Sequence, residues 1–186
     1  MKKKILNSSI NFIKKHKNYN EEELEIIAYG LESIYLVITK AIIIFTLAYI
    51  LGILKETLIL LLTYNIIRTQ AFGIHASRSI YCLISSILMF IGGAYLCIYL
   101  TLPLKIIMII SLMCNLLILM YAPADTHKRP LINERKRMKF KYKSITLAII
   151  YTIIIFTIKD NAIINFLLIG MIEATIMILP ITYKLF

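Results

Sequence analysis

The sequence is poor in acidic residues: its 186 positions hold only 10 Asp and Glu against 21 Lys and Arg, a formal net charge of +11. It has only 3 cysteines and no secretory cleavage pattern, which excludes a disulfide framework. A soluble nucleic-acid-binding protein would explain the charge. However, 60% of the residues are hydrophobic, more than so short a chain can bury in one core. The same apolar excess excludes intrinsic disorder. We therefore expect a small membrane protein with its charges in the loops and no nucleic-acid partner.

Four apolar runs are long enough to cross the hydrocarbon core of a bilayer, which takes about 20 residues. They cover residues 34–53, 80–102, 104–122 and 162–183. Two weaker runs, 57–67 and 145–158, are too short alone and need flanking turns such as 141–143. The pattern predicts an all-α, polytopic membrane protein with about six transmembrane helices.

The basic residues test this count, because Lys and Arg are enriched in cytoplasmic loops. With six spans, 17 of the 21 basic residues fall on one side of the membrane and only Lys55, Lys105 and Lys159 on the other. The remaining one, Lys40, lies inside the first span. The bias predicts a multi-pass protein with both termini in the cytoplasm.

The N-terminal stretch alternates apolar residues with lysines over residues 5–13 and continues into an acidic run at 21–25. This pattern predicts an interfacial amphipathic helix that leads into a second helical segment. A signal peptide is not expected, because an apolar core of about seven residues is missing. No repeat or domain boundary is visible. We expect one membrane domain over 1–186, with cytoplasmic or interfacial helices at 1–30 and a transmembrane bundle at 31–186.

Polar side chains concentrate where the second span ends, and at membrane depth such groups need protein or water partners. His75 and Cys82 are the chemically important pair in this segment. In a continuous helix they would be separated by about 10 Å along the axis, too far for a hydrogen bond. Gly73 and a cap at Ser77 or Ser79 favour a connection that carries His75, followed by a helix with Cys82 in its first turn.

In that position the helix N-terminus would favour a Cys82 thiolate, and a folded-back imidazole could take the proton, as nucleophilic catalysis requires. The alternative is structural, since cysteine is commonly a small buried apolar residue. Cys97 and Cys114 fall inside apolar spans with no nearby base, so we interpret both as packing residues. Neither a metal site nor a cofactor site is expected.

The pattern Arg68-x4-Gly73-Ile-His75-Ala-x5-Cys82 resembles the catalytic signature of the accessory gene regulator B (AgrB) family. These are membrane cysteine endopeptidases of Gram-positive quorum sensing. Residues 29–32 resemble the family's segment before the first span. Residues 121–126, followed by Pro-Leu at 130–131 and a basic stretch, resemble its motif after the fourth span. The family pattern often has a second glycine in the neighbourhood of Phe72.

The resemblance implies that His75 and Cys82 are the catalytic pair, with Arg68 and Gly73 in the same signature. It implies an AgrD-like propeptide as substrate. The C-terminal tail is removed through an acyl-enzyme thioester, and the rest closes to a cyclic thiolactone or lactone, an autoinducing peptide in virulence regulation. It also implies a homodimer in the bacterial cell membrane, in contact with lipid.

Arg68, Asp125 and Glu173 each keep more than one interpretation. Arg68 would serve as an oxyanion donor or as an interfacial anchor. Asp125 would orient His75, or else end the fourth span or pair with a nearby basic residue; Ser77 is a cap rather than a nucleophile. Glu173 lies within the sixth span, where it would pair with Lys40 or act in substrate passage.

Two other functions compete with the peptidase. A peptide exporter or transporter is disfavoured by the small size and by the lack of visible inverted repeats and of a nucleotide-binding loop. A non-catalytic membrane scaffold explains the spans but leaves the His75 and Cys82 cluster without a role.

Overall fold

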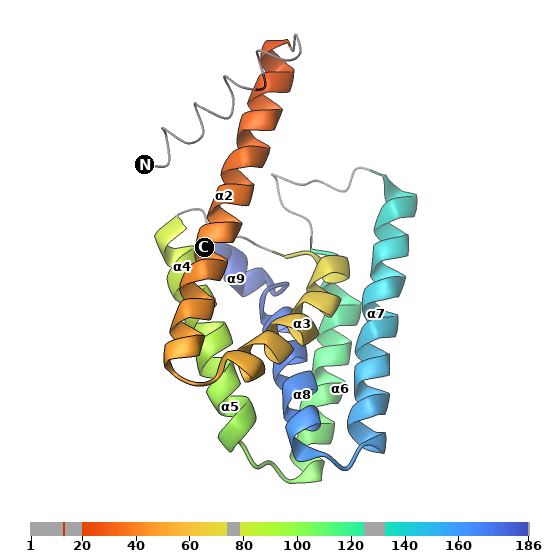
Figure 1. Ribbon diagram of the computed structural model, residues 1–186. Coiled ribbons are helices and arrows are strands. Elements are labelled where there is room, and N and C mark those ends of the chain that lie inside the picture. The colour runs from red at the N-terminus through yellow and green to blue at the C-terminus, as the bar shows by residue number, and fades with distance from the viewer. Residues whose placement is uncertain (1–12, 14–19, 74–78, 125–132, 186) are drawn as a thin grey trace. The chain divides into compact units, whose positions relative to one another are not determined.

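The computed structural model describes residues 13, 20–73, 79–124 and 133–185, and all regular elements in these ranges are helices (Figure 1). In chain order they are α2 (Glu21–Ile50), α3 (Leu54–Ala71), α4 (Ser79–Ile87), the π-helical turn η1 (Leu88–Gly92), α5 (Gly93–Tyr99), α6 (Leu104–Tyr121), α7 (Glu134–Thr157), α8 (Asn161–Ile176) and α9 (Pro180–Leu185). The expected all-α class is confirmed. The amphipathic helix expected at 5–13 lies outside the described residues, apart from Ile13.

The chain divides into two compact units, residues 1–47 and 48–186. In the first unit, α2 begins with a reciprocal capping box. The Asn20 N–H donates to the Glu23 carboxylate at 3.1 Å, and the Glu23 N–H donates to the Asn20 side-chain oxygen at 2.8 Å. The acidic run after Asn20 therefore starts a helix that continues without interruption into the apolar residues of the first expected span.

A glycine turn at the start of the second unit separates α2 from α3. Gly52 has a φ of +72°. Its N–H donates to the Tyr49 carbonyl at 3.1 Å, and the Ile53 N–H donates to the Ala48 carbonyl at 2.9 Å. This pair of bonds is a Schellman motif, in which glycine takes the left-handed position that ends the helix.

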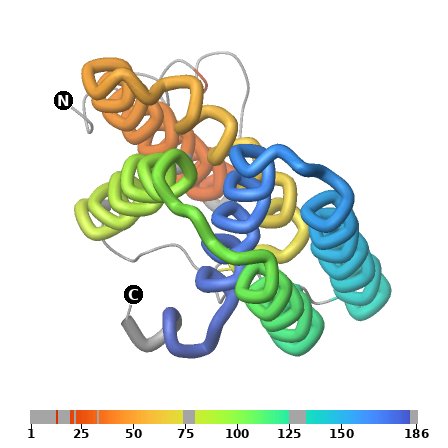
Figure 2. Tube along the Cα trace, turned by 90° about the horizontal axis from the view of Figure 1, so that it is seen from below, coloured from red at the N-terminus to blue at the C-terminus, as the bar shows by residue number. Residues whose placement is uncertain are grey.

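Helix α8 is the central helix of the second unit and contacts α3, α5, α6 and α7 (Figures 1 and 2). Its residues are buried from Ile164 to Thr175, apart from the partly buried Ile172. A small residue allows close approach to α3, because a Cβ at Gly170 would lie only 2.6 Å from Thr63 Oγ1. Since protein surrounds α8, it can carry polar side chains that a lipid-facing helix could not.

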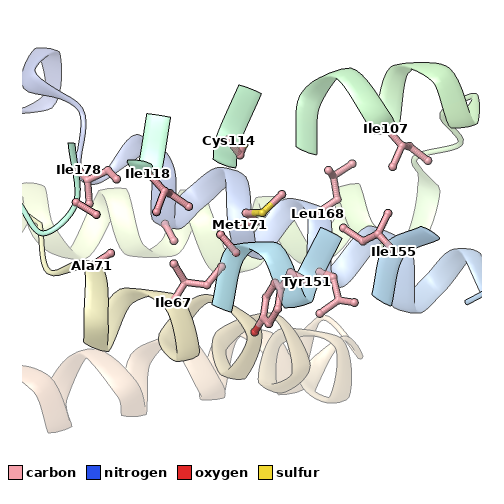
Figure 3. Packing of buried hydrophobic residues seen from close by; sticks show 14 of the residues in the cluster. Ile67, Ala71, Ile107, Cys114, Ile118, Tyr151, Ile155, Leu168, Met171 and Ile178 are labelled. Atoms are coloured by element: carbon pink, nitrogen blue, oxygen red, sulfur yellow. The ribbon is translucent and has the colours of Figure 1, made fainter. Parts of the chain in front are cut away.

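The apolar core lies where α3, α6, α7 and α8 face one another (Figure 3). Met171 of α8 lies at its centre, with Cys114 of α6 on one side and Ile67 of α3 on the other. Tyr151 of α7 reaches across to α3, where its hydroxyl donates to the Thr63 carbonyl at 2.9 Å. The core thus fixes α3 and α8 against each other, and both helices lead to the candidate site.

Four of the described helical segments are long and apolar enough to cross a membrane: 23–50, 80–99, 104–121 and 134–157. On α6, Leu112, Met113 and Leu116 are each more than half exposed in the isolated chain, as lipid-facing side chains would be. The membrane character is therefore confirmed, but the expected count of six spans is not, because α3 and α8 do not meet the same criteria.

The two exceptions have different physical causes. Helix α3 carries three charged residues, Lys55, Glu56 and Arg68, within 18 positions. The expected span at 162–183 is interrupted, because α8 ends at Ile176 and a new helix begins at Pro180. Proline lacks an N–H and disfavours helical geometry at the preceding residue. The 16 residues of α8 are about 24 Å long, less than the hydrocarbon thickness.

The run at 145–158, expected to be weak, belongs instead to a long helix. Helix α7 has 24 residues and includes the basic stretch that precedes the apolar run. The Asn133 side chain caps its first turn by accepting from the Lys136 N–H at 3.3 Å. The flanking residues 141–143 are helical, as the shortness of the apolar run required.

Candidate active site

The segment that follows α3 pairs with the segment that follows α6. The Gly73 N–H donates to the Ala124 carbonyl at 2.9 Å, and the Ala124 N–H donates to the Ala71 carbonyl at 2.9 Å. These bonds make a short parallel bridge between Phe72 and Ala124. The ends of α3 and α6, which carry two separate sequence motifs, are therefore joined at one end of the bundle.

Phe72 has an unusual backbone conformation at this bridge. Its φ of +62° and ψ of −138° are values that favour glycine. The ring packs edge-to-face on Phe140 of α7, with centroids 4.9 Å apart and planes at 88°. Phe72 thus adopts a conformation that glycine takes more readily, and the aromatic contact adds attraction that offsets part of the backbone strain.

Gly73, the next residue, is needed for a close approach. Its φ is +113°, and a Cβ there would collide with the Arg68 guanidinium and lie 2.5 Å from the Met177 carbonyl oxygen. Met177 belongs to the break between α8 and α9. The start of the connection that carries His75 is therefore enclosed by α3, by Ala124 and by the end of α8.

Arg68 lies in the last turn of α3 and has a defined partner. Its Nε donates to the Tyr64 hydroxyl at 3.0 Å, a contact between residues four apart on one helix face. Sequence reasoning did not single out Tyr64, although its spacing from Arg68 is the signal that would have identified it.

Cys82 is the fourth described residue of α4 and is partly buried. Residues 74–78 lie outside the described residues, so its place in the first helical turn stays a prediction. Its carbonyl accepts hydrogen bonds from the hydroxyls of Ser85 at 3.1 Å and Ser86 at 2.7 Å. Cys97 and Cys114 are buried inside the bundle, in agreement with their interpretation as packing residues.

His75, Ser77 and Asp125 lie outside the described residues. The His75–Cys82 pair, the cap at Ser77 and the orienting role of Asp125 therefore stay predictions. The described chain shows where the connections begin and end: one leaves at Gly73 and enters α4, and the other begins after Ala124.

Glu173 is the one acidic side chain buried within the described part of the bundle, with 6% of its surface exposed. Its Oε2 has no hydrogen-bond partner among the described residues. Its Oε1 lies 2.5 Å from the position that a Cβ on Gly93 would take. The Lys40 partner expected from the sequence belongs to the other compact unit, so that pair stays a prediction.

Exposed basic residues collect at the same end of the bundle as the bridge. They lie on the first turns of α7 and comprise Arg135, Lys136, Arg137, Lys139 and Lys143. Lys105 and Lys159 lie at the other end, at the start of α6 and between α7 and α8 (Figure 1). In the described residues no group of three or more His, Cys, Asp or Glu side chains is arranged to hold a metal ion.

Comparison with known proteins gives one consistent result. A family model described as accessory gene regulator B matches residues 6–178. A putative AgrB-like protein of Clostridium acetobutylicum is 36% identical over 92% of this chain and 83% of its own length. Accessory gene regulator protein B of Staphylococcus aureus (strain MRSA252) is 32% identical over 93% and 91%, respectively. A putative AgrB-like protein of Listeria innocua is 32% identical over 89% and 81%. None of the solved structures matches the chain.

Proposed function

The chain belongs to the accessory gene regulator B family of quorum-sensing proteins, and from this membership we propose that it is a membrane-embedded cysteine endopeptidase. Its substrate is an AgrD-like propeptide, from which it removes the C-terminal tail. It then promotes closure of the remaining peptide to a thiolactone or lactone. Cys82 is the nucleophile and His75 the general acid and base.

One observation carries the proposal. Cys82 is partly buried near the start of the described part of α4. The connection that contains His75 starts at Gly73, whose N–H is bonded to Ala124. A hydrogen-bonded start of the connection and a helix at its other end restrict where a nucleophile and its base can lie, and this supports their pairing.

The reaction proceeds in two exchanges. His75 accepts the Cys82 thiol proton, the thiolate adds to the scissile carbonyl, and the leaving amine of the tail takes the proton from His75. The acyl group is then a thioester on Cys82. A thiol or hydroxyl of the substrate attacks this thioester, closes the ring and releases the Cys82 thiol. A thiol attack exchanges one thioester for another of similar energy, so this step needs no nucleotide.

Topology supports the same function. We propose a multi-pass protein with both termini in the cytoplasm, because the exposed basic residues of α7 lie at the end of the bundle that holds the Gly73 bridge. A propeptide made in the cytoplasm reaches the site from that side. Lipid covers the exposed apolar helix faces. Two copies of the chain form a homodimer, which crosslinking in native membranes would detect.

The test uses purified protein in liposomes with a synthetic AgrD-like propeptide that has an amphipathic start, a central Cys or Ser and an acidic tail. Cleavage is followed by mass spectrometry. We expect Cys82→Ala and His75→Ala to abolish cleavage, and Cys114→Ala, which changes a buried packing cysteine on α6, to retain it. Cleavage by Cys82→Ala at the wild-type rate would refute the peptidase. Transport of uncut peptide into the liposomes would favour the exporter instead.

A further inference from the structure

Helix α7 changes character along its length. Residues 145–157 are apolar apart from threonines and Tyr151, and this part is about 20 Å long, about 10 Å less than the hydrocarbon core of a bilayer. The residues before it are mostly basic: Arg135, Lys136, Arg137, Lys139, Lys141 and Lys143 stand against one acidic residue, Glu134. Because the apolar part is short, the basic part begins where acyl chains meet lipid headgroups.

The two sides of α7 have different surroundings. The side that faces the bundle carries the buried residues Ser144, Ala148, Tyr151 and Ile155, at helical spacings of three and four. The opposite side, here called the outer face, is exposed and comprises Arg135, Lys139, Tyr142, Thr146, Ile149 and Ile153. Figure 2 shows α7 at the edge of the second unit, so the unit itself leaves this face open.

The outer face runs from cationic to apolar along the helix. Ile149 and Ile153 are exposed as lipid-facing side chains would be, and Tyr142 lies two turns before Ile149. Tyrosine is enriched where hydrocarbon meets headgroups, so cations one to two turns further out lie at the depth of the lipid phosphates. Within the described residues, neither Arg135 nor Lys139 is paired with an acidic side chain.

We propose that the outer face of α7 binds the headgroups of anionic phospholipids. Arg135 and Lys139 contact the phosphodiester, the first through a fork of N–H donors and the second as a point charge. A lipid whose acyl chains cover Ile149 and Ile153 brings its own headgroup to these cations, whereas an acidic peptide would first have to displace that lipid. This binding does not depend on the peptidase chemistry.

The test is native mass spectrometry of the full chain in a neutral detergent. The protein is titrated with phosphatidylglycerol or with phosphatidylcholine of the same acyl chains. The wild type should bind the anionic lipid at least about tenfold more tightly, because each basic residue near an anionic surface contributes about fivefold. Arg135→Gln/Lys139→Gln, which neutralises the outer face, should lose most of this preference.

The matched control is Arg137→Gln/Lys141→Gln, which removes the same charge from the same half of α7. Each of these two residues precedes a buried residue of the helix by seven positions, so both lie on the side that faces the bundle. This variant should keep the preference for phosphatidylglycerol. Arg135→Lys/Lys139→Arg, which keeps both outer charges, should keep it as well.

Three outcomes would overturn the proposal. Equal losses in the two glutamine variants would show that total charge, and not the outer face, sets lipid binding. A wild type that does not distinguish the two lipids would show that no such site exists. An outer-face variant that keeps its lipid preference but binds a synthetic acidic peptide less tightly would assign the face to a peptide. All variants are compared at equal helical circular dichroism, so that a loss of folding is not read as a loss of binding.

Discussion

The backbone at Phe72 offers a sharp test of the structure, because the expected sign is opposite to the ordinary one. Phe72 has a φ of +62° and a ψ of −138°, between the end of α3 and Gly73. At an ordinary position, replacing alanine by glycine destabilises a protein by about 0.4–1 kcal/mol. At Phe72, glycine should be the more stable of the two substitutions, because it alone adopts this conformation without steric cost.

Two contributions set the stability of the wild-type residue at this position, and only the first differs between the two variants. A non-glycine residue in such a region costs about 1–3 kcal/mol. The edge-to-face pair with Phe140 contributes about 0.5–1.5 kcal/mol beyond its burial. Both Phe72→Ala and Phe72→Gly lose this pair, whereas only Phe72→Gly relieves the strain. We therefore expect Phe72→Gly to be more stable than Phe72→Ala by about 1–2 kcal/mol.

The assay is thermal unfolding in detergent, followed by the loss of helical circular dichroism. For a chain of 186 residues the difference corresponds to a melting temperature about 2–8 °C higher for the glycine variant. Leu100 is the matched control: it is also partly buried and follows a helix, but its φ is −77°. There the alanine variant should melt higher. A Phe72→Ala variant more stable than Phe72→Gly would refute the positive φ.

Three further outcomes are expected. Gly170→Ala should lower the melting temperature by several degrees, because the new Cβ meets α3 at 2.6 Å; Gly92→Ala, with nothing within 4 Å, serves as the control and should change little. Asn165→Asp should destabilise the fold by about 1–3 kcal/mol, since the Nδ2 that donates to two carbonyls at the end of α5 (2.9 and 2.8 Å) is lost; an unchanged unfolding midpoint would show that this cap contributes nothing. Iodoacetamide should label the partly buried Cys82 faster than the buried Cys97 in folded protein, as measured by peptide mass spectrometry. Equal labelling rates would contradict this difference in burial.

Features that depend on neighbouring residues could be predicted from the sequence. The acidic run after Asn20 begins a helix, as its pattern indicated, and Cys82 belongs to a helix that follows the polar connection after Gly73. Pro180 also carried a local signal, but a long apolar run concealed it, so the last span was expected to be one helix. Hydropathy measures length and apolarity, and it does not register the steric effect of one proline.

Features that depend on distant residues could not be predicted. The bridge between Gly73 and Ala124 joins positions on different helices, and no periodicity indicates it. The burial of α8 on all sides depends on the packing of four other helices around it. The close approach of the Glu173 carboxyl group to the backbone of Gly93 likewise depends on how separate helices pack.

The contacts of Gly73 have a consequence for biosynthesis. This residue is bonded to Ala124 and packs against the carbonyl of Met177, so its surroundings include segments translated long after α3. A ribosome-bound chain that has inserted α3 and α4 already contains Cys82 but lacks the end of α6 and the break after α8. Cys82 is therefore synthesised early, and the contacts around Gly73 form late. An unfinished or C-terminally truncated chain would carry Cys82 without these contacts, so the proposed peptidase would depend on completed insertion.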